Sequence, residues 1–251
     1  MQVFFVGAGP GSPELITVKG QRLLGAADVI IYAGSLVNPA LLELAKPGAA
    51  IYNSASMTLD EVIGVMSEAA KAGKMTVRLH TGDPSIYGAI QEQMDQLEQR
   101  GISYEVVPGV SSFLATAAAL KQEYTLPDVS QTVIITRLEG RTPVPEKEKL
   151  ALLASHCATM CIFLSVHMLD DVIGELISGG YAANTPVAVV QKASWPDQRI
   201  FRGTLETIAR IVAEEGVDRT AMIVVGKVLD CNYSLSRLYA PEFGHMFRDA
   251  K

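Results

Sequence analysis

Short apolar runs alternate with longer amphipathic segments along most of the chain. The apolar runs are rich in Val and Ile, and in the segments between them apolar residues recur every three or four positions. Runs of the first kind are typical of buried strands, and the others are typical of helices that cover a sheet. In the first half this pattern predicts strands at Val3–Val6, Val29–Tyr32, Ala50–Tyr52, Met75–Leu79 and Ser103–Val107.

The segments between these strands carry the marks of helices. Thr17 can cap a helix N-terminus with its side chain, and Pro39 suits a first helical turn. The predicted helices are Thr17–Ala27, Pro39–Ala45, Thr58–Lys71, Ile86–Arg100 and Ser111–Leu120. Strands joined by helices of about 10–15 residues form βαβ units, so the pattern indicates an α/β fold whose first sheet is mostly parallel.

A second α/β unit is expected to begin near Leu126, where a Leu-Pro-Asp turn interrupts the pattern. The stretch Ala193–Gly203, with Pro196-Asp197 at its centre, indicates a hairpin, so the second sheet should be mixed. We therefore predict two α/β domains, residues 1–125 and 126–251, and expect the aromatic tail from Leu229 to pack down. The second domain's predicted strands are Thr132–Thr136, Met160–Val166, Val187–Val190, Gln198–Arg202 and Ala221–Val225, and its helices Glu146–Ala154, Leu169–Ser178 and Leu205–Glu214.

Composition limits the class of protein. Hydrophobic residues make up 49% and charged residues 19% of the chain, which suffices for a packed core. No apolar run approaches the ~18 residues of a membrane span, and the opening MQVFFVGAGPG resembles a strand rather than a signal peptide. The three cysteines form no secreted disulfide framework, and a net charge of −6 disfavours general nucleic-acid binding. We expect a cytoplasmic protein with neither a nucleic-acid nor a membrane partner.

A glycine-rich loop, GAGPGS at Gly7–Ser12, follows the first strand. It invites comparison with the dinucleotide-binding fingerprint, but Ser12 occupies the place of the third glycine and Pro10 has no N–H to offer a pyrophosphate. The next strand ends in Tyr32, not in an acid that would hold a ribose, and Asp28 lies at its start. A nicotinamide-dependent oxidoreductase thus remains an alternative of a different class. A tight turn that merely needs glycine is the structural alternative.

Two other predicted strands end in similar loops, Gly82-Asp83-Pro84 and Pro108–Ser112. In an open α/β sheet, ligands bind outside the carboxyl ends of the strands. We therefore expect all three loops on one rim, where backbone amides and carbonyls can contact a ligand.

Taken together, these segments resemble the tetrapyrrole (corrin/porphyrin) methyltransferase family. The matching stretches follow family order over nearly the whole chain: VGAGPGSPELITVKG from Val6, VRLHTGDPSIYG from Val77, VVPGVSS from Val106, PVAVVQKASWPDQRIFRGTL from Pro186 and AMIVVGKV from Ala221. The resemblance implies two α/β domains with a cleft between them, S-adenosylmethionine (SAM) in that cleft, a tetrapyrrole in an adjoining trough, and a homodimer.

Within the family, further stretches are similar to members that methylate precorrin-4 or cobalt-precorrin-4 at C11. They are YAGSLVNP from Tyr32, RLHTGDPSIYGAI from Arg78, SQTVIITRLEGRTPVPE from Ser130, KASWPDQ from Lys192 and SRLYAPEFGHMFR from Ser236. The resemblance implies a SAM-dependent C-methyltransferase of cobalamin biosynthesis. A methyltransferase of an earlier tetrapyrrole precursor is the alternative within the family, and a tetrapyrrole carrier without SAM affinity is a further alternative.

The family's SAM contacts carry over onto matching positions of this chain. They fall on Pro10, Thr81, Gly82, Asp83, Ser111, Ser112, Leu164, Ala193, Ala221 and Met222. Thr81 and Leu164 depart from the pattern, because relatives that act on earlier precursors often carry glycine and methionine there. We expect contacts at these two positions through backbone or apolar atoms. Asp83 has two interpretations, as an acceptor toward SAM or a nearby loop, or as a cap of the turn before Pro84.

The substrate of such an enzyme carries many carboxylates, which require arginine, lysine or backbone N–H partners. Arg137 and Arg141 follow a predicted strand and are our candidates for carboxylate binding. His80, at another strand end, is either a hydrogen-bond donor to the substrate or a structural histidine. No residue stands out as a general base, so the catalytic residues stay unassigned.

Two histidines and two cysteines lie close together in the second half of the chain: His156, Cys157, Cys161 and His167. Their spacing lacks a second ligand pair, and Cys161 falls within an apolar predicted strand. Buried cysteine is common in protein cores. We therefore expect no metal.

Overall fold

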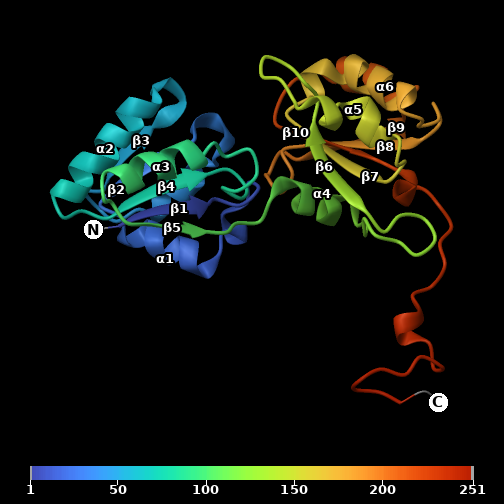
Figure 1. The fold of residues 1–251 in the computed structure, drawn as a ribbon, viewed down its shortest axis with the longest axis horizontal. Helices are drawn as coiled ribbons and strands as arrows, with labels where there is room; N and C mark the ends of the chain where they lie inside the picture. The colour runs from blue at the N-terminus through green and yellow to red at the C-terminus, as the bar shows by residue number, and fades with distance from the viewer. Residues whose placement is uncertain (1, 250–251) are drawn as a thin grey trace. The chain divides into compact units, whose positions relative to one another are not determined.

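The computed structural model describes residues 2–249 and divides them into two compact units. The first comprises the chain as far as Thr116 together with Lys192–Gln198, and the second comprises Ala117–Gln191 and the chain from Arg199 onward. Each holds one five-stranded sheet covered by helices (Figure 1). The sequence-based boundary between residues 125 and 126 did not place the 192–198 loop with the first unit. Among the described residues, no helix is both long and apolar enough to span a bilayer.

The sheet of the first unit is entirely parallel, with the strand order β3-β2-β4-β1-β5. Its strands are β1 Val3–Gly7, β2 Val29–Tyr32, β3 Ala50–Asn53, β4 Thr76–His80 and β5 Tyr104–Val107. The central strands β1 and β4 are buried throughout. This burial explains the apolar sequence of β1, whereas β4 also carries the buried polar residues Thr76, Arg78 and His80. The predicted α/β class with a parallel first sheet is confirmed.

Helices cover both faces of this sheet (Figure 1). Side chains of β1 alternate, so that Phe4 and Val6 pack toward α1 (Val18–Ala26) while Val3 and Phe5 pack toward α2 and α3. The other helices assigned largely to this unit are α2 Leu59–Lys71, α3 Gln91–Gln99 and α4 Ser112–Leu120, the last of which crosses the division. Short 3-10 helices span Pro13–Leu15, Gly34–Leu36, Pro39–Leu44 and Ser54–Ser56.

A capping box begins α2. The Thr58 hydroxyl accepts a hydrogen bond from the Glu61 N–H at 3.3 Å, and the Glu61 carboxylate accepts one from the Thr58 N–H at 2.7 Å. Two backbone donors that the helix leaves unpaired are thereby satisfied. The predicted N-cap of α1 is also confirmed, since the Thr17 hydroxyl accepts from the Gly20 N–H.

Thr58→Ala is expected to lower the free energy of unfolding by about 1 kcal/mol, because the Glu61 N–H loses its acceptor. Urea denaturation followed by circular dichroism measures the change. Thr58→Ser keeps the hydroxyl and is the matched control, with most of the stability retained. Equal losses in the two variants would contradict a capping role.

The sheet of the second unit is mixed, with the order β6-β7-β10-β8-β9. Its strands β6 Val133–Arg137 and β7 Thr159–Phe163 are parallel, whereas β8 Pro186–Gln191, β9 Arg199–Thr204 and β10 Ala221–Val225 join through antiparallel pairs. The helices α5 Leu150–Ala154, α6 Leu169–Ser178 and α7 Ile208–Glu214 share one core with the sheet. Further 3-10 helices span Glu146–Glu148, Val166–Met168, Lys227–Leu229 and Arg237–Tyr239. The predicted hairpin and mixed sheet are confirmed.

Two predicted boundaries were wrong for the same physical reason. The helix predicted from Ile86 begins only at Gln91, because Tyr87 and Ala89 adopt left-handed backbone conformations that a helix does not contain. The strand predicted to reach Val166 ends at Phe163, since Leu164 has a φ of 54°. All three residues lie in loops that follow the carboxyl ends of strands, Tyr87 and Ala89 after β4 and Leu164 after β7.

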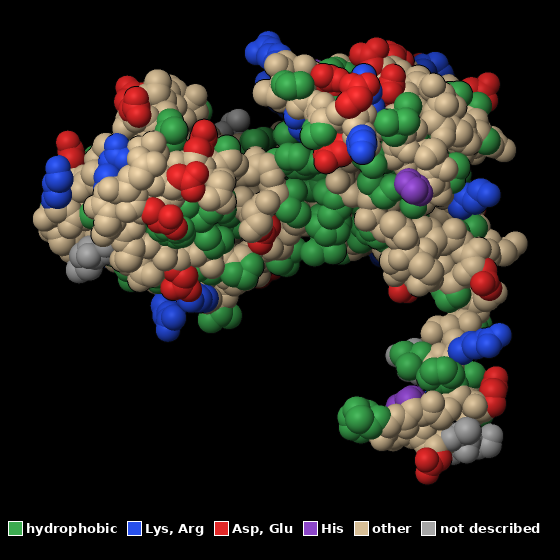
Figure 2. All heavy atoms as spheres, viewed as in Figure 1, with side chains coloured by type: hydrophobic (Ala, Val, Ile, Leu, Met, Phe, Trp, Pro, Cys, Tyr) green, Lys and Arg blue, Asp and Glu red, His purple; other side chains and the backbone are tan. Residues whose placement is uncertain are grey.

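The C-terminal tail does not pack down as predicted. Figure 2 shows hydrophobic side chains on the surface of this segment. Tyr233 is 55%, Leu235 83% and Phe247 85% exposed. The Arg248 guanidinium instead donates to carbonyls within the tail, among them those of Leu238 and Phe243. The rings of Phe243, His245 and Phe247 contact one another in a local motif, outside the core cluster of the second unit.

Candidate functional site

The three loops predicted to share a rim are hydrogen-bonded to one another. The Ala8 N–H donates to the His80 carbonyl at 2.7 Å, which links the end of β1 to the end of β4. Gly9 and Gly82 then exchange two backbone bonds, Gly9 N–H to Gly82 O at 3.2 Å and the reverse at 2.9 Å. We call the loops Gly7–Ser12, Thr81–Pro84 and Pro108–Ser112 the rim.

The rim depends on backbone contacts that only glycine allows. A Cβ atom on Gly7 would lie 2.5 Å from the Gly109 Cα and 2.6 Å from the Gly82 carbonyl oxygen. A Cβ on Gly109 would lie 2.2 Å from that same oxygen. Three main-chain segments therefore meet at distances that no side chain permits, as a surface that holds a ligand through main-chain atoms requires.

Asp83 fulfils both roles that its position suggested within the protein. Its Oδ2 accepts from the Gly109 N–H at 2.8 Å, in a neighbouring loop, and its Oδ1 accepts from the Ser85 N–H at 2.8 Å, in its own turn. The carboxylate thus fastens β4's loop to β5's loop. Direct contact between Asp83 and SAM stays a prediction.

Polar side chains complete the rim. The Thr81 Oγ1 is buried and has no hydrogen-bond partner in the described structure. Ser111 is also buried, and Ser112 is the first residue of α4. A buried hydroxyl without a partner is costly unless a ligand or water satisfies it. The rim therefore offers main-chain groups and one unsatisfied hydroxyl, which fits a polar ligand such as SAM.

The side chains of His80 and Arg78 lie on the face of the sheet that α2 and α3 cover, not on the rim surface. The His80 imidazole is 3% exposed, and its Nε2 has no described hydrogen-bond partner. Burial, and secondarily the Arg78 charge, lower the pKa of His80 to about 3. The Arg78 guanidinium donates to Gln93 Oε1 at 3.2 Å and to the Ile31 carbonyl at 3.3 Å, and burial lowers its pKa to about 10.

The burial of His80 favours its interpretation as a structural histidine. The imidazole packs beside the Phe5 ring, with ring centroids 6.1 Å apart. Its interaction with a substrate stays a prediction.

Two further predicted SAM contacts, Pro10 and Ala193, belong to the first unit. Pro10 is buried in the glycine loop, and Ala193, 6% exposed, lies in the 192–198 loop. The structure thus collects Pro10, Thr81, Gly82, Asp83, Ser111, Ser112, His80 and Ala193 in one unit.

The remaining predicted contacts belong to the second unit, where Leu164 directly follows β7 and Ala221-Met222 begin β10. Leu164 is 56% exposed with its backbone left-handed, and it lies outside the strand on which we had expected it. Met222 is 4% exposed. An exposed leucine held in a strained conformation is available to contact an apolar ligand surface.

Arg137 and Arg141 have different environments. The half-buried Arg137 guanidinium donates to the carbonyls of Leu138, Thr142 and Pro143, the shortest bond being 2.7 Å. It therefore organises the loop that follows β6. Arg141 is exposed within that loop, so its guanidinium can reach a carboxylate in solution.

Comparison with known proteins identifies the family to which the chain belongs. Residues 2–209 match the family model for Tetrapyrrole (Corrin/Porphyrin) Methylases. The chain belongs to the tetrapyrrole methylase family. A cobalt-precorrin-4 C(11)-methyltransferase of Methanocaldococcus jannaschii is 61% identical over 98% of this chain and 96% of its own length.

Solved structures of tetrapyrrole methylases share the fold. The X-ray structure of a cobalamin biosynthetic enzyme, cobalt precorrin-4 methyltransferase, superposes with a TM-score of 0.90 at 50% identity, covering 92% of this chain and 96% of that one. A uroporphyrin-III C-methyl transferase of Thermus thermophilus, complexed with S-adenosylhomocysteine, gives a TM-score of 0.76 at 29% identity, covering 92% and 94%.

Sequence reasoning missed the contacts that Ser194 and Trp195 make with the glycine loop. The Trp195 indole N–H donates to the Pro10 carbonyl, and the Ser194 hydroxyl accepts from the Ser12 N–H. The available signal was the chain's single tryptophan in the KASWPDQ stretch, which we used only to recognise the family. Within residues 2–249, no three His, Cys, Asp or Glu side chains are grouped as a metal ion would require.

Proposed function

We propose that this protein transfers a methyl group from SAM to C11 of precorrin-4 or cobalt-precorrin-4. The observation that carries the proposal is 61% identity, over 98% of this chain, to a cobalt-precorrin-4 C(11)-methyltransferase. The TM-score of 0.90 to a cobalt precorrin-4 methyltransferase supports the same substrate. The methylase bound to S-adenosylhomocysteine supports SAM as the donor.

SAM, when bound, supplies a methyl group already activated by its sulfonium. The residues of this chain then have two tasks, alignment of the reacting groups and exclusion of water. Main-chain amides and carbonyls of the rim would bind the donor's polar groups, and the Thr81 hydroxyl would gain the partner that it lacks. Neither task needs a catalytic triad, which agrees with the unassigned general base.

We place the substrate's carboxylates at the loop that follows β6. Arg141 is its exposed cation, and Arg137 holds the loop through three carbonyls. Carboxylates bind guanidinium groups through charge-assisted hydrogen bonds, frequently two at once.

Arg141→Ala is expected to raise the tetrapyrrole's apparent dissociation constant about fivefold, equivalent to about 1 kcal/mol for one exposed charge contact. Arg137→Ala should also raise this dissociation constant, because the loop after β6 loses the guanidinium that donates to its carbonyls. SAM affinity should stay nearly unchanged in both. Calorimetric titration measures the two affinities, and the exposed Arg210→Ala serves as the matched control. A loss of SAM affinity in Arg137→Ala would contradict this placement.

The proposed reaction is tested with SAM carrying a 13C-labelled methyl group. Incubation of the enzyme with precorrin-4, and separately with its cobalt form, should give a product heavier by one methyl group and release S-adenosylhomocysteine. Carbon NMR should then place the label at C11. Transfer only to uroporphyrinogen III would favour a methyltransferase of an earlier precursor. Binding of NAD(P) in place of SAM would favour an oxidoreductase.

We also propose that the enzyme is a homodimer in the cytoplasm. The resemblance to the family supports the dimer, and the cysteine usage supports the compartment. Light scattering coupled to size-exclusion chromatography tests the dimer, for which a mass near twice 26.9 kDa is expected.

A further inference from the structure

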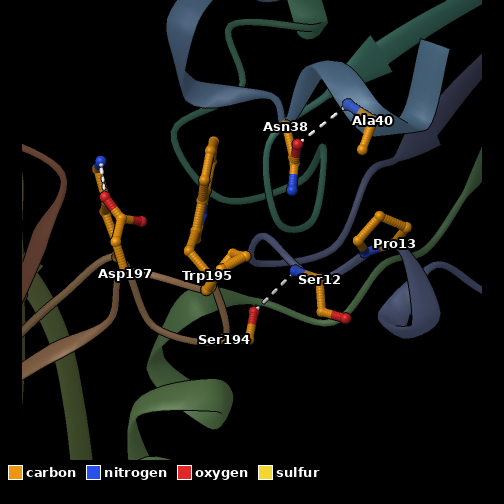
Figure 3. A pocket seen from close by; sticks show the side chains of 9 residues that line it. Ser12, Pro13, Asn38, Ala40, Ser194, Trp195 and Asp197 are labelled. Carbon is orange, nitrogen blue, oxygen red and sulfur yellow. Dashed lines mark hydrogen bonds and ion pairs between the residues drawn. The ribbon is translucent and has the colours of Figure 1, made fainter. Parts of the chain in front are cut away.

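The 192–198 loop is hydrogen-bonded to the glycine loop that follows β1 (Figure 3). The Trp195 Nε1–H donates to the Pro10 carbonyl at 3.0 Å. Two residues further along, the Ser12 N–H donates to the Ser194 Oγ at 3.0 Å. Both bonds join segments more than 180 residues apart in the sequence. They fix the main chain on either side of Gly11.

Gly11 lies directly against the indole. A Cβ atom on this glycine would lie 2.0 Å from the Trp195 Cδ1 and 2.2 Å from its Nε1. The ring therefore occupies the space in which any other residue at position 11 would place its side chain. Glycine at this position is explained by the tryptophan and not by a ligand.

Internal contacts constrain the conformation of the 192–198 loop. Lys192 and Ser194 hold left-handed conformations, with φ of 50° and 70°, which non-glycine residues keep only where the surroundings enforce them. The Trp195 N–H donates to the Lys192 carbonyl at 2.9 Å, and the Ser194 N–H donates to Gln198 Oε1 at 2.8 Å. Lys192 also forms an ion pair with Asp197 and lies 5.7 Å from the centre of the indole ring.

The indole is half-buried and forms part of the wall of a cavity of about 570 Å³ (Figure 3). Ser12, Pro13 and Asn38 line the same cavity. The Asn38 side chain donates to the Gly11 carbonyl at 2.9 Å, so the glycine loop is held from a second direction. One side of the Trp195 ring thus contacts the glycine loop, and another side faces the cavity. A movement of the glycine loop would therefore change the environment of the ring.

We propose that Trp195 is a positioning residue of the methyl-donor site, which holds Pro10–Ser12 in the conformation that SAM binds. The proposal rests on the proposed function, because it takes the glycine loop as part of the donor site. Ser194 makes the second hydrogen bond between the 192–198 loop and the glycine loop. The indole acts through the loop and needs no contact with SAM itself.

Tryptophan fluorescence reports on the contact between Trp195 and the glycine loop, because Trp195 is the only tryptophan of the chain. Titration of the wild-type protein with S-adenosylhomocysteine should change the intensity or wavelength of the Trp195 emission. The midpoint should match the dissociation constant from calorimetry. Gly11→Ala should shift the emission to longer wavelength without any ligand, since the added methyl displaces the ring.

Steady-state kinetics separate positioning from general stability. Trp195→Phe keeps a ring but removes the donor to Pro10, and should raise KM for SAM about fivefold to tenfold, the loss of one hydrogen bond. We expect kcat and KM for the tetrapyrrole to stay within about twofold. Ser194→Ala should raise KM for SAM in the same direction, and the double variant should fall short of the product of the two single effects.

Ser155→Ala is the matched control, because it also removes a hydroxyl bonded to backbone but lies at the end of α5. It should leave KM for SAM unchanged. The proposal is overturned if Trp195→Phe and Gly11→Ala both fold and keep the wild-type KM for SAM. It is also overturned if calorimetry shows S-adenosylhomocysteine binding while the Trp195 emission stays constant. Absence of binding to the wild-type protein would instead refute the proposed function, and the positioning role with it.

Discussion

Replacing Gly109 by alanine is expected to weaken SAM binding about 100-fold, equivalent to about 2.7 kcal/mol. The new Cβ would lie 2.2 Å from the Gly82 carbonyl oxygen and 2.7 Å from the Gly7 Cα, so main chain and not a flexible side chain must move. Movement at this point displaces all three loops of the rim together. Overpacking of this kind also costs about 1–3 kcal/mol of stability. Calorimetric titration with S-adenosylhomocysteine and urea denaturation measure the two effects.

Gly64→Ala is the matched control for this substitution. Gly64 lies inside α2, has no positive φ, and an added Cβ would meet no atom within 4 Å. Because alanine favours helices more than glycine does, the control should gain about 0.5–1 kcal/mol of stability and bind SAM normally. Wild-type SAM affinity in Gly109→Ala would show that the close approach of the loops does not matter for binding.

The buried His80 should make the fold sensitive to acid. Its pKa is about 3 in the folded protein, against about 6.5 in an unfolded chain. Between these values the unfolded state binds a proton that the folded state does not, so stability falls as the pH is lowered through the window. The slope is about 1.4 kcal/mol per pH unit, which amounts to about 2 kcal/mol between pH 6.5 and pH 5. Stability from this source is fully present above pH 6.5.

His80→Met removes the titrating group and keeps an apolar side chain beside Phe5. Urea denaturation at pH 7 and at pH 5 measures how much the free energy of unfolding falls between the two pH values. This fall should be smaller by about 2 kcal/mol in His80→Met than in the wild type, whatever the variant's absolute stability. His156→Met, at an exposed position, is the control and should keep the wild-type difference. An unaltered pH dependence in His80→Met would mean that the imidazole is protonated inside the fold.

Much of the fold could be predicted from local pattern. The bounds of β2, α6 and β10 agree with the sequence-based prediction to the residue. β2 and β10 are continuous apolar runs, and α6 is a strongly periodic amphipathic segment. The rim was predictable as well, since parallel strands bring the loops after β1, β4 and β5 to one edge. The resemblance to the family correctly indicated the tetrapyrrole methylases.

What pattern did not reveal depends on tertiary structure. Tyr87, Ala89 and Leu164 carry no glycine-like signal for a left-handed backbone, and the surrounding loops impose it. The burial of His80 follows from its register opposite Gly7, which no local periodicity specifies. The bonds from the 192–198 loop to Pro10 and Ser12 join segments too distant in sequence for any pattern to pair.

The central claim is that main chain of the rim loops holds the methyl donor, and a co-crystal structure with S-adenosylhomocysteine tests it most directly. We predict that backbone atoms of the loops after β1, β4 and β5 lie within hydrogen-bond distance of the ligand, and that the Thr81 hydroxyl gains a partner. S-adenosylhomocysteine bound away from all three loops, or excluded from the crystal at saturating concentration, would contradict the account.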